Sequence, residues 1–193
     1  MERRRNPRQY RLLDLALFAL MLLVFESLII LASTRWFPGQ PWTVSLVPAL
    51  VAIVLVRWGP WAAIHAILGG VVLCVRSGAA LPQYAVYCVG NCFPLLLLPW
   101  WTRWRQEEGV FRSSGKALAF GAAVLLLTQA GRAVMTLLFG ASLPLAAGCF
   151  TTEAVTDLFT LVILWIVRRL DGLLEDQGHY LKRIQEEEKA ARL

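Results

Sequence analysis

Charge is scarce in this 193-residue chain and is confined to a few places. Aspartate, glutamate, lysine and arginine make up 17% of the residues, whereas apolar residues make up 58%. Residues 44–56, 61–75, 84–101 and 117–131 contain no charged side chain at all. A soluble domain distributes charge along each amphipathic helix, so these stretches exclude an ordinary soluble fold and indicate helices within a bilayer.

The sequence also lacks the motifs of common active sites. It has no G-x-S-x-G, no H-E-x-x-H, no P-loop and no acidic cluster arranged for two magnesium ions. Cys74, Cys88, Cys92 and Cys149 lie in apolar stretches, without the spacing of a disulfide framework or a zinc ribbon. Cys88 and Cys92 are one helical turn apart and could bind a soft metal, but we interpret all four as buried small hydrophobic residues. We predict no enzyme activity, no catalytic residue, no metal site and no cofactor.

Six apolar stretches are predicted to cross the membrane as helices, because backbone amides in hydrocarbon need internal partners and no alternating strand pattern is present. The predicted spans are residues 12–32, 42–56, 61–75, 84–101, 117–139 and 143–167. They make an all-α integral membrane protein with one membrane domain, residues 1–193. The second and third spans are short and are separated by Arg57-Trp58-Gly59-Pro60. This turn signal predicts a tight hairpin rather than one long broken helix.

The positions of lysine and arginine set the orientation. With the N-terminus in the cytoplasm, the basic residues at 3–11, at 57, at 103–116 and from 168 onward lie inside. Arg35 and Arg76 fall outside, and Arg132 lies within a span. Both termini are therefore predicted to be cytoplasmic, since an odd number of spans would break the positive-inside rule. Membrane orientation accounts for the net charge of +6, so we predict no nucleic-acid partner.

Residues 168–193 form a polar C-terminal tail in which apolar residues recur at roughly helical spacing. We predict an amphipathic helix that extends the last span along the membrane surface or toward a partner; a frayed, solvated tail is the alternative. Near the inner membrane boundary, Asp14 is expected to pair with Arg11. His65 is expected to be a packed core residue rather than a ligand.

Ionisable side chains at membrane depth cost about 2.5–3.5 kcal/mol each on insertion scales, so they require a partner or a wet cavity. In the predicted topology Glu26, Arg132 and Glu153 all fall in the outer half of the membrane, on three different spans. We predict that they line an outward-facing pocket in which Arg132 pairs with Glu26 or Glu153 when no ligand is bound. The alternative is an interhelical ion pair that only fixes packing.

Other polar and aromatic residues are predicted to complete this pocket. Asp157 follows Glu153 by one helical turn and shares its face. Hydrogen bonds are expected from amide, hydroxyl and phenol groups, and stacking from tryptophans or Tyr84. The predicted substrate-binding residues are Glu26, Tyr84, Tyr87, Asn91, Gln129, Arg132, Thr152, Glu153 and Thr156.

Residues 45–70, SLVPALVAIVLVRWGPWAAIHAILGG, contain a polar-led span, a proline, a short basic-glycine turn and a glycine-bearing span. With Gly90-Asn91 in the fourth span and Thr151-Thr152-Glu153 in the sixth, this order resembles the substrate-binding S components of energy-coupling factor (ECF) transporters, which are small bacterial proteins with six membrane helices. The resemblance implies uptake of a vitamin or related micronutrient across the bacterial cytoplasmic membrane.

The resemblance also implies protein partners, namely a membrane coupling subunit and two cytoplasmic ATPase subunits. Family members dock on the coupling subunit through small alanines spaced four apart on the first helix. Here Ala16 is followed at that spacing by Leu20, while Ala19 is three residues away. Docking is therefore expected on the face formed by Ala16, Ala19 and Leu20.

A second hypothesis is a non-transporting membrane scaffold, similar in size and span number to the shape-determining proteins of the MreD family. Its functional part would be the C-terminal helix from Arg168, which would recruit a cytoplasmic partner. Truncation after Arg169 separates the hypotheses, because a scaffold would lose its partner whereas a substrate-binding protein would keep its ligand.

Overall fold

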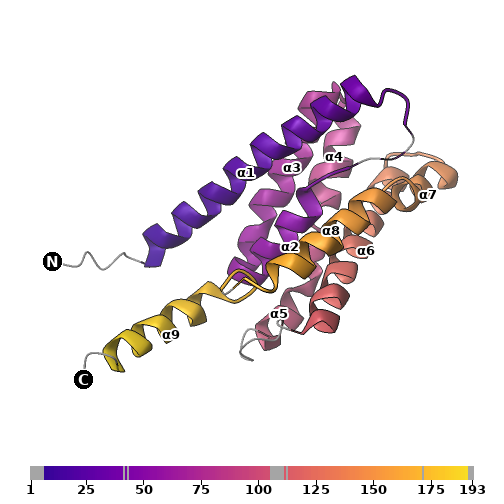
Figure 1. Cartoon of the computed structure of the whole chain (residues 1–193). Coiled ribbons are helices and arrows are strands. Elements are labelled where there is room, and N and C mark those ends of the chain that lie inside the picture. Colours follow the sequence, from indigo (N-terminus) through magenta and orange to yellow (C-terminus); the bar gives the residue numbers. More distant parts are fainter. Residues whose placement is uncertain are drawn as a thin grey trace.

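The computed structural model describes residues 7–40, 42, 44–104, 111, 113–170 and 172–190. Within these ranges the chain is all-helical and contains no strand. Its elements are α1 (Pro7–Trp36), α2 (Val47–Trp58), η1 (Gly59–Trp61), α3 (Ala62–Ser77), α4 (Leu81–Gly90), η2 (Phe93–Leu97), α5 (Leu98–Trp104), α6 (Ser114–Leu138), α7 (Leu143–Thr151), α8 (Ala154–Val167) and α9 (Gln177–Ala190). The start of α1 and the whole of α9 lie at one end of the bundle, and α7 lies at the other (Figure 1).

Five helical segments in the described residues are long and apolar enough to cross a membrane. They are Arg8–Trp36, Val47–Ser77, Leu81–Trp100, Ser114–Leu138 and Leu143–Val167. Each of the six predicted spans falls largely within one of them, and Val47–Ser77 contains two.

Gly59 reverses the chain between α2 and α3. It adopts φ 58° and ψ −117°, a backbone conformation that glycine reaches without steric cost. A Cβ atom built on Gly69 would lie 2.4 Å from Cγ2 of Val47. A continuous helix would hold these residues about 30 Å apart at 1.5 Å per residue. The helices α2 and α3 are therefore an antiparallel hairpin, and one long broken helix is excluded.

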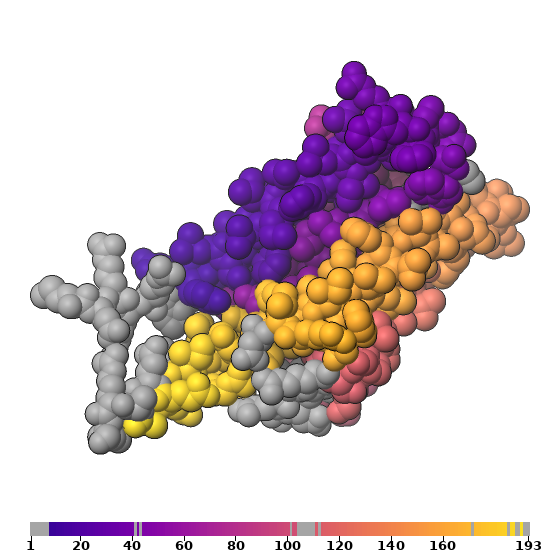
Figure 2. Space-filling model, in the orientation of Figure 1, coloured from indigo at the N-terminus to yellow at the C-terminus, as the bar shows by residue number. Residues whose placement is uncertain are grey.

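The buried centre of the bundle is α2, in which every residue from Val47 to Arg57 is buried. The helices α1, α3, α6 and α8 pack around it, and Figure 2 shows α1 and α8 on the face nearest the viewer. On α1 only a narrow face is buried, at Leu15, Phe18, Leu22, Glu26 and Ile30. Large apolar side chains elsewhere on α1 are exposed, among them Leu12, Leu17, Leu20 and Leu28, as expected of a helix that faces lipid.

Two predicted spans are not continuous helices, which corrects the sequence prediction. In residues 84–101 the helix α4 ends at Gly90, and η2 and α5 follow. In residues 143–167 the helix α7 ends at Thr151 and α8 begins at Ala154. Pro94 accounts for the first break, because it has no N–H for the helical ladder. The second predicted span also begins late, since α2 starts at Val47 rather than at Trp42.

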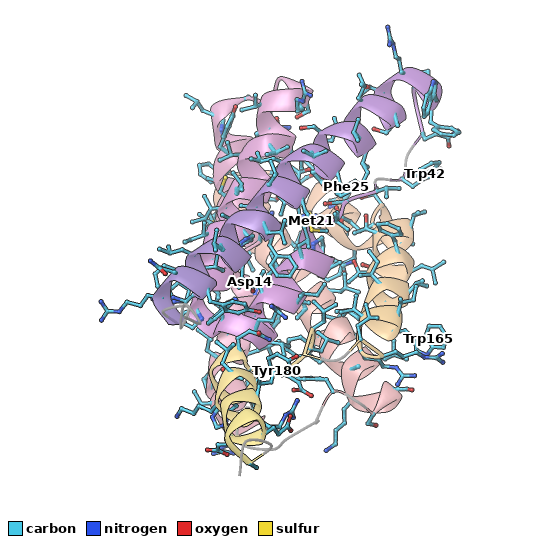
Figure 3. The ribbon with its side chains drawn as sticks, turned by 60° about the vertical axis from the view of Figure 1, so that its left-hand side comes forward. Asp14, Met21, Phe25, Trp42, Trp165 and Tyr180 are labelled. Carbon is cyan, nitrogen blue, oxygen red and sulfur yellow. The ribbon has the colours of Figure 1, made fainter. Side chains whose placement is uncertain are left out.

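The C-terminal helix forms, but it does not directly extend the last span. After α8 ends at Val167, Gly172 adopts a φ of 71° and α9 begins only at Gln177. The Gly172 backbone lies so close to Tyr180 that a Cβ would be 2.7 Å from the phenol ring. Gly172 therefore permits the turn after α8, and its lack of a side chain leaves room for Tyr180 of α9 to pack against the turn. Figure 3 shows Tyr180 and Asp14 toward the same end, and Phe25 and Trp42 toward the other.

Candidate substrate-binding site

Arg132, on α6, is buried at the centre of a polar cluster. Its Nη1 donates to Oε1 of Glu153 at 2.5 Å, and its Nε donates to Oδ1 of Asn91 at 2.8 Å. The amide of Asn91 in turn donates to the carbonyl of Ala66 at 3.3 Å. The guanidinium carbon lies 5.1 Å from the centre of the Tyr87 ring. One guanidinium thus contacts three side chains from two distant parts of the chain, the end of α4 and the start of α8, and the expected pairing with Glu153 is present.

Two glycines let the backbone approach Arg132 this closely. A Cβ on Gly90 would lie 2.8 Å from the backbone nitrogen of Arg132, and a Cβ on Gly131 would lie 2.5 Å from the carbonyl oxygen of Gly90. The helices α4 and α6 therefore touch backbone to backbone where they cross. This contact places Asn91, which directly follows Gly90, beside the guanidinium.

Glu26, on α1, is fully buried and anchors the start of α2. Its Oε1 accepts from Oγ of Ser45 at 2.8 Å, and its Oε2 accepts from the backbone N–H of Leu46 at 2.8 Å. Glu26 also lies near enough to Arg132 and Glu153 to interact electrostatically with both. The prediction that these three ionisable residues occupy one level of the bundle agrees with this geometry.

The helix α8 adds two further polar groups to the same region. The hydroxyl of Thr156 accepts from the backbone N–H of Ser45 at 3.1 Å. Asp157 accepts two hydrogen bonds from Nε2 of Gln129, at 2.8 and 2.9 Å. Ser45 was not predicted, and Asp157 was placed on the face of Glu153 without a binding role of its own. Ser45 could have been found as the polar residue that directly precedes the apolar α2 segment. Asp157 could have been found from its spacing of one helical turn from Glu153.

Both interrupted spans break at this cluster. Asn91 follows the last residue of α4, and Glu153 precedes the first residue of α8. Backbone that leaves the helical ladder at membrane depth is tolerated where it is buried in protein or lines a wet site, and broken helices of this kind form binding sites in transporters. The two breaks meet at Arg132, which contacts both residues.

Two predicted binding residues take other positions. Thr152 donates from its hydroxyl to the carbonyl of Gly148 at 2.9 Å, within its own helix, so its hydroxyl is used locally. Tyr84 is half-buried one turn before Tyr87 on α4. The structure thus groups Glu26, Tyr87, Asn91, Gln129, Arg132, Glu153 and Thr156 around the cluster.

A second buried arginine lies at the end of the bundle that carries α9. Arg57 forms a two-pronged ion pair with Asp14, with N–O distances of 2.8 to 3.0 Å. Its Nη1 also donates to the carbonyl of Gly172 at 2.7 Å, and Nε2 of Gln177 donates to that same carbonyl at 2.6 Å. The expected partner of Asp14 was therefore wrong. The guanidinium of Arg11 instead lies 4.7 Å from the ring centre of Trp61.

Within the described part of the chain, the side chains of the remaining predicted residues form no hydrogen bond with a member of either cluster. Ala16 and Leu20 are exposed on the face of α1 that points away from the bundle, and Ala19 is half-buried. This face is therefore uncovered in the single chain. His65 is a fully buried core residue whose Nε2 lies 3.1 Å from the carbonyl of Leu15. The thiols of Cys88 and Cys92 lie within hydrogen-bonding distance of backbone carbonyls. The described residues contain no group of three or more potential metal ligands.

Comparison of the chain with protein-family models, curated proteins and solved structures found no relative. No protein-family model matches the chain, and no curated protein or solved structure matches it significantly.

Proposed function

We propose that this chain is the substrate-capture (S) subunit of an ECF-type importer for a vitamin or related micronutrient. In this proposal it crosses the bacterial cytoplasmic membrane six times, with both termini inside. It works with a membrane coupling subunit and two cytoplasmic ATPase subunits, and Ala16, Ala19 and Leu20 are available on the exposed side of α1 for docking. The ligand would bind at the Arg132 cluster.

The observation that carries the proposal is the meeting of two helix breaks at one buried arginine. Ionisable side chains at membrane depth are energetically costly unless they pair with one another or line a water-filled cavity, so they mark candidate sites. Five segments of the chain contribute to the cluster: α1, the start of α2, the end of α4, α6 and α8. The cluster lies in the half of the bundle opposite the Asp14–Arg57 pair, which is the outer half if the basic segments are cytoplasmic.

The proposed test separates a ligand site from a purely structural ion pair. Removing Arg132 alone would leave the carboxylate of Glu153 buried and unpaired, so the variant could fail to fold. The double variant Arg132→Gln/Glu153→Gln removes both charges and keeps two hydrogen-bonding amides. The matched control is Arg76→Gln, at an exposed arginine on the same predicted side.

Thermal-shift binding to a vitamin panel and cellular uptake are the two measurements. We expect the double variant to fold with a melting temperature near that of the wild type and to lose binding and uptake at least tenfold. The control should keep both activities. A folded double variant with unchanged binding and uptake would show that the ion pair only fixes packing. Co-purification with ATPase subunits tests the ECF assignment separately.

The scaffold hypothesis is favoured by one observation, the ordered helix α9 at the end of the bundle. Its Glu186 and Glu187 are exposed and available to a cytoplasmic partner. Truncation after Arg169 would abolish partner recruitment if the chain were a scaffold. A substrate-capture subunit should instead keep its ligand affinity after the same truncation, provided that the truncated chain still folds.

A further inference from the structure

The charge of Arg132 is already balanced within the cluster. Glu153 accepts from its guanidinium at 2.5 Å, Asn91 accepts from Nε, and the Tyr87 ring lies against it. An anionic ligand would have to displace Glu153 and leave that carboxylate without its cation. The arginine is therefore poorly placed to select an anion.

The other carboxylates of the cluster accept from neutral donors. Glu26 accepts from a serine hydroxyl and a backbone N–H, and Asp157 accepts from the side-chain amide of Gln129. Among the described residues of the cluster, three carboxylates face one basic group. The excess formal charge is negative, and its carboxylates lie on α1, on α8 and directly before α8.

A buried hydroxyl with unused hydrogen-bonding capacity lies on the same helix. Thr160 is fully buried, and its Oγ1 has no hydrogen-bond partner in the described part of the chain. It lies one turn after Thr156 on the buried face of α8, and three residues after Asp157. A buried hydroxyl without a partner is unusual, and this observation is independent of the charges. The hydroxyl could bond to a polar group placed beside Asp157.

We propose that the ligand of this site carries a positively charged nitrogen, which binds beside Asp157 and Glu26 and within reach of the Thr160 hydroxyl. The inference rests on the proposed function and names the chemical class of its substrate, an organic cation. The cation would supply the positive charge that the cluster lacks, and the Arg132–Glu153 pair would stay intact. Charge-assisted hydrogen bonds of this kind are stronger than neutral ones.

The test uses the purified full chain and small probe ions of matched size. Ethylammonium and tetramethylammonium, as chlorides, are compared with propionate and acetate, as sodium salts, at constant ionic strength. We expect the ammonium ions to raise the melting temperature of the wild type in a saturable manner, and the carboxylates to have no such effect. Asp157→Asn, which keeps the shape of the side chain, should weaken the apparent ammonium affinity at least tenfold.

Two further variants guard against a general loss of folding. Thr160→Val removes the hydroxyl without changing the volume much, so it should fold and bind the primary ammonium ion several-fold more weakly. Glu186→Gln removes an exposed carboxylate on α9 and should leave the ammonium response unchanged. Stabilisation by carboxylates that equals or exceeds that by ammonium ions would overturn the inference, as would an ammonium response that Asp157→Asn leaves intact.

These outcomes differ from a failure of the proposed function. If an anionic vitamin bound and the Arg132→Gln/Glu153→Gln variant lost it, the chain would still be a substrate-capture protein and only the cation inference would fall. If the wild-type chain bound no vitamin of the panel and supported no uptake, the proposed function would fall, and the inference that rests on it would fall as well.

Discussion

Gly131→Ala tests whether the close crossing of α4 and α6 positions the arginine. The added Cβ would lie 2.5 Å from the carbonyl oxygen of Gly90, whereas such carbon–oxygen contacts normally measure about 3.3 Å or more. The two backbones must therefore separate by roughly 0.8 Å. The hydrogen bond from Arg132 to Asn91, now 2.8 Å long, would stretch to about 3.6 Å, beyond useful range.

The energetic consequence follows from two opposing terms. Replacing glycine by alanine within a helix gains up to about 1 kcal/mol. Overpacking at a tight contact costs about 1–3 kcal/mol. The control Gly148→Ala lies in α7 with nothing within 4 Å of the new Cβ, so it gains the first term without the second. Gly131→Ala should therefore be about 1–3 kcal/mol less stable than this control.

The assay compares unfolding in detergent and probe binding for the two variants. Gly131→Ala should unfold at lower temperature than Gly148→Ala and bind ligand at least tenfold more weakly, because the Asn91–Arg132 geometry is lost. Equal unfolding transitions and equal affinities for the two variants would refute the reasoning. They would mean that the crossing relaxes without disturbing the arginine.

Two further predictions concern the opposite end and the topology. Arg57→Ala leaves Asp14 without its cation and the Gly172 carbonyl without one donor. We expect the free energy of unfolding to fall by about 3–5 kcal/mol relative to Arg76→Ala. Trypsin should also cleave faster after Lys182 than in Arg76→Ala, and an unchanged cleavage rate would contradict the prediction. In a background without the natural cysteines, Trp61→Cys and Ala80→Cys should react with impermeant thiol reagents from opposite sides of the membrane, because α3 separates them. Labelling of both from one side would exclude the six-span topology.

The helices were largely predictable because hydrocarbon imposes them. Long apolar runs predicted the positions of α1, α3 and α6 to within a few residues, and Gly59 with Pro60 indicated the reversal. Pro94 was available as a signal for the break after α4, although the run of apolar residues obscured it. The break before α8 carries no glycine or proline at Thr152 and Glu153. It depends on tertiary contacts, which a local pattern does not contain.

Pairing between distant residues was predictable only where depth restricted the choices. A membrane topology places Glu26, Arg132 and Glu153 at one level, so the pairing of Arg132 with Glu153 could be expected. Asp14 had a neighbouring arginine at Arg11, and sequence proximity favoured that partner wrongly. The pair with Arg57 forms because the α2–α3 turn returns to the start of α1, which is information that only the fold provides.

The two buried arginines differ in what their partners can do. Arg57 donates to Asp14 and also to the backbone carbonyls of Gly172 and Leu173. A backbone carbonyl cannot leave its hydrogen bond by a change of side-chain rotamer. Arg132 donates to the side chains of Asn91 and Glu153, each of which begins or ends a helix break and can change rotamer. An arginine held by backbone carbonyls fixes the turn that carries them, whereas Arg132, held by side chains at two interruptions, links the two helix breaks to each other. We therefore expect changes at Arg57 to lower stability, and the paired change at Arg132 and Glu153 to lower binding.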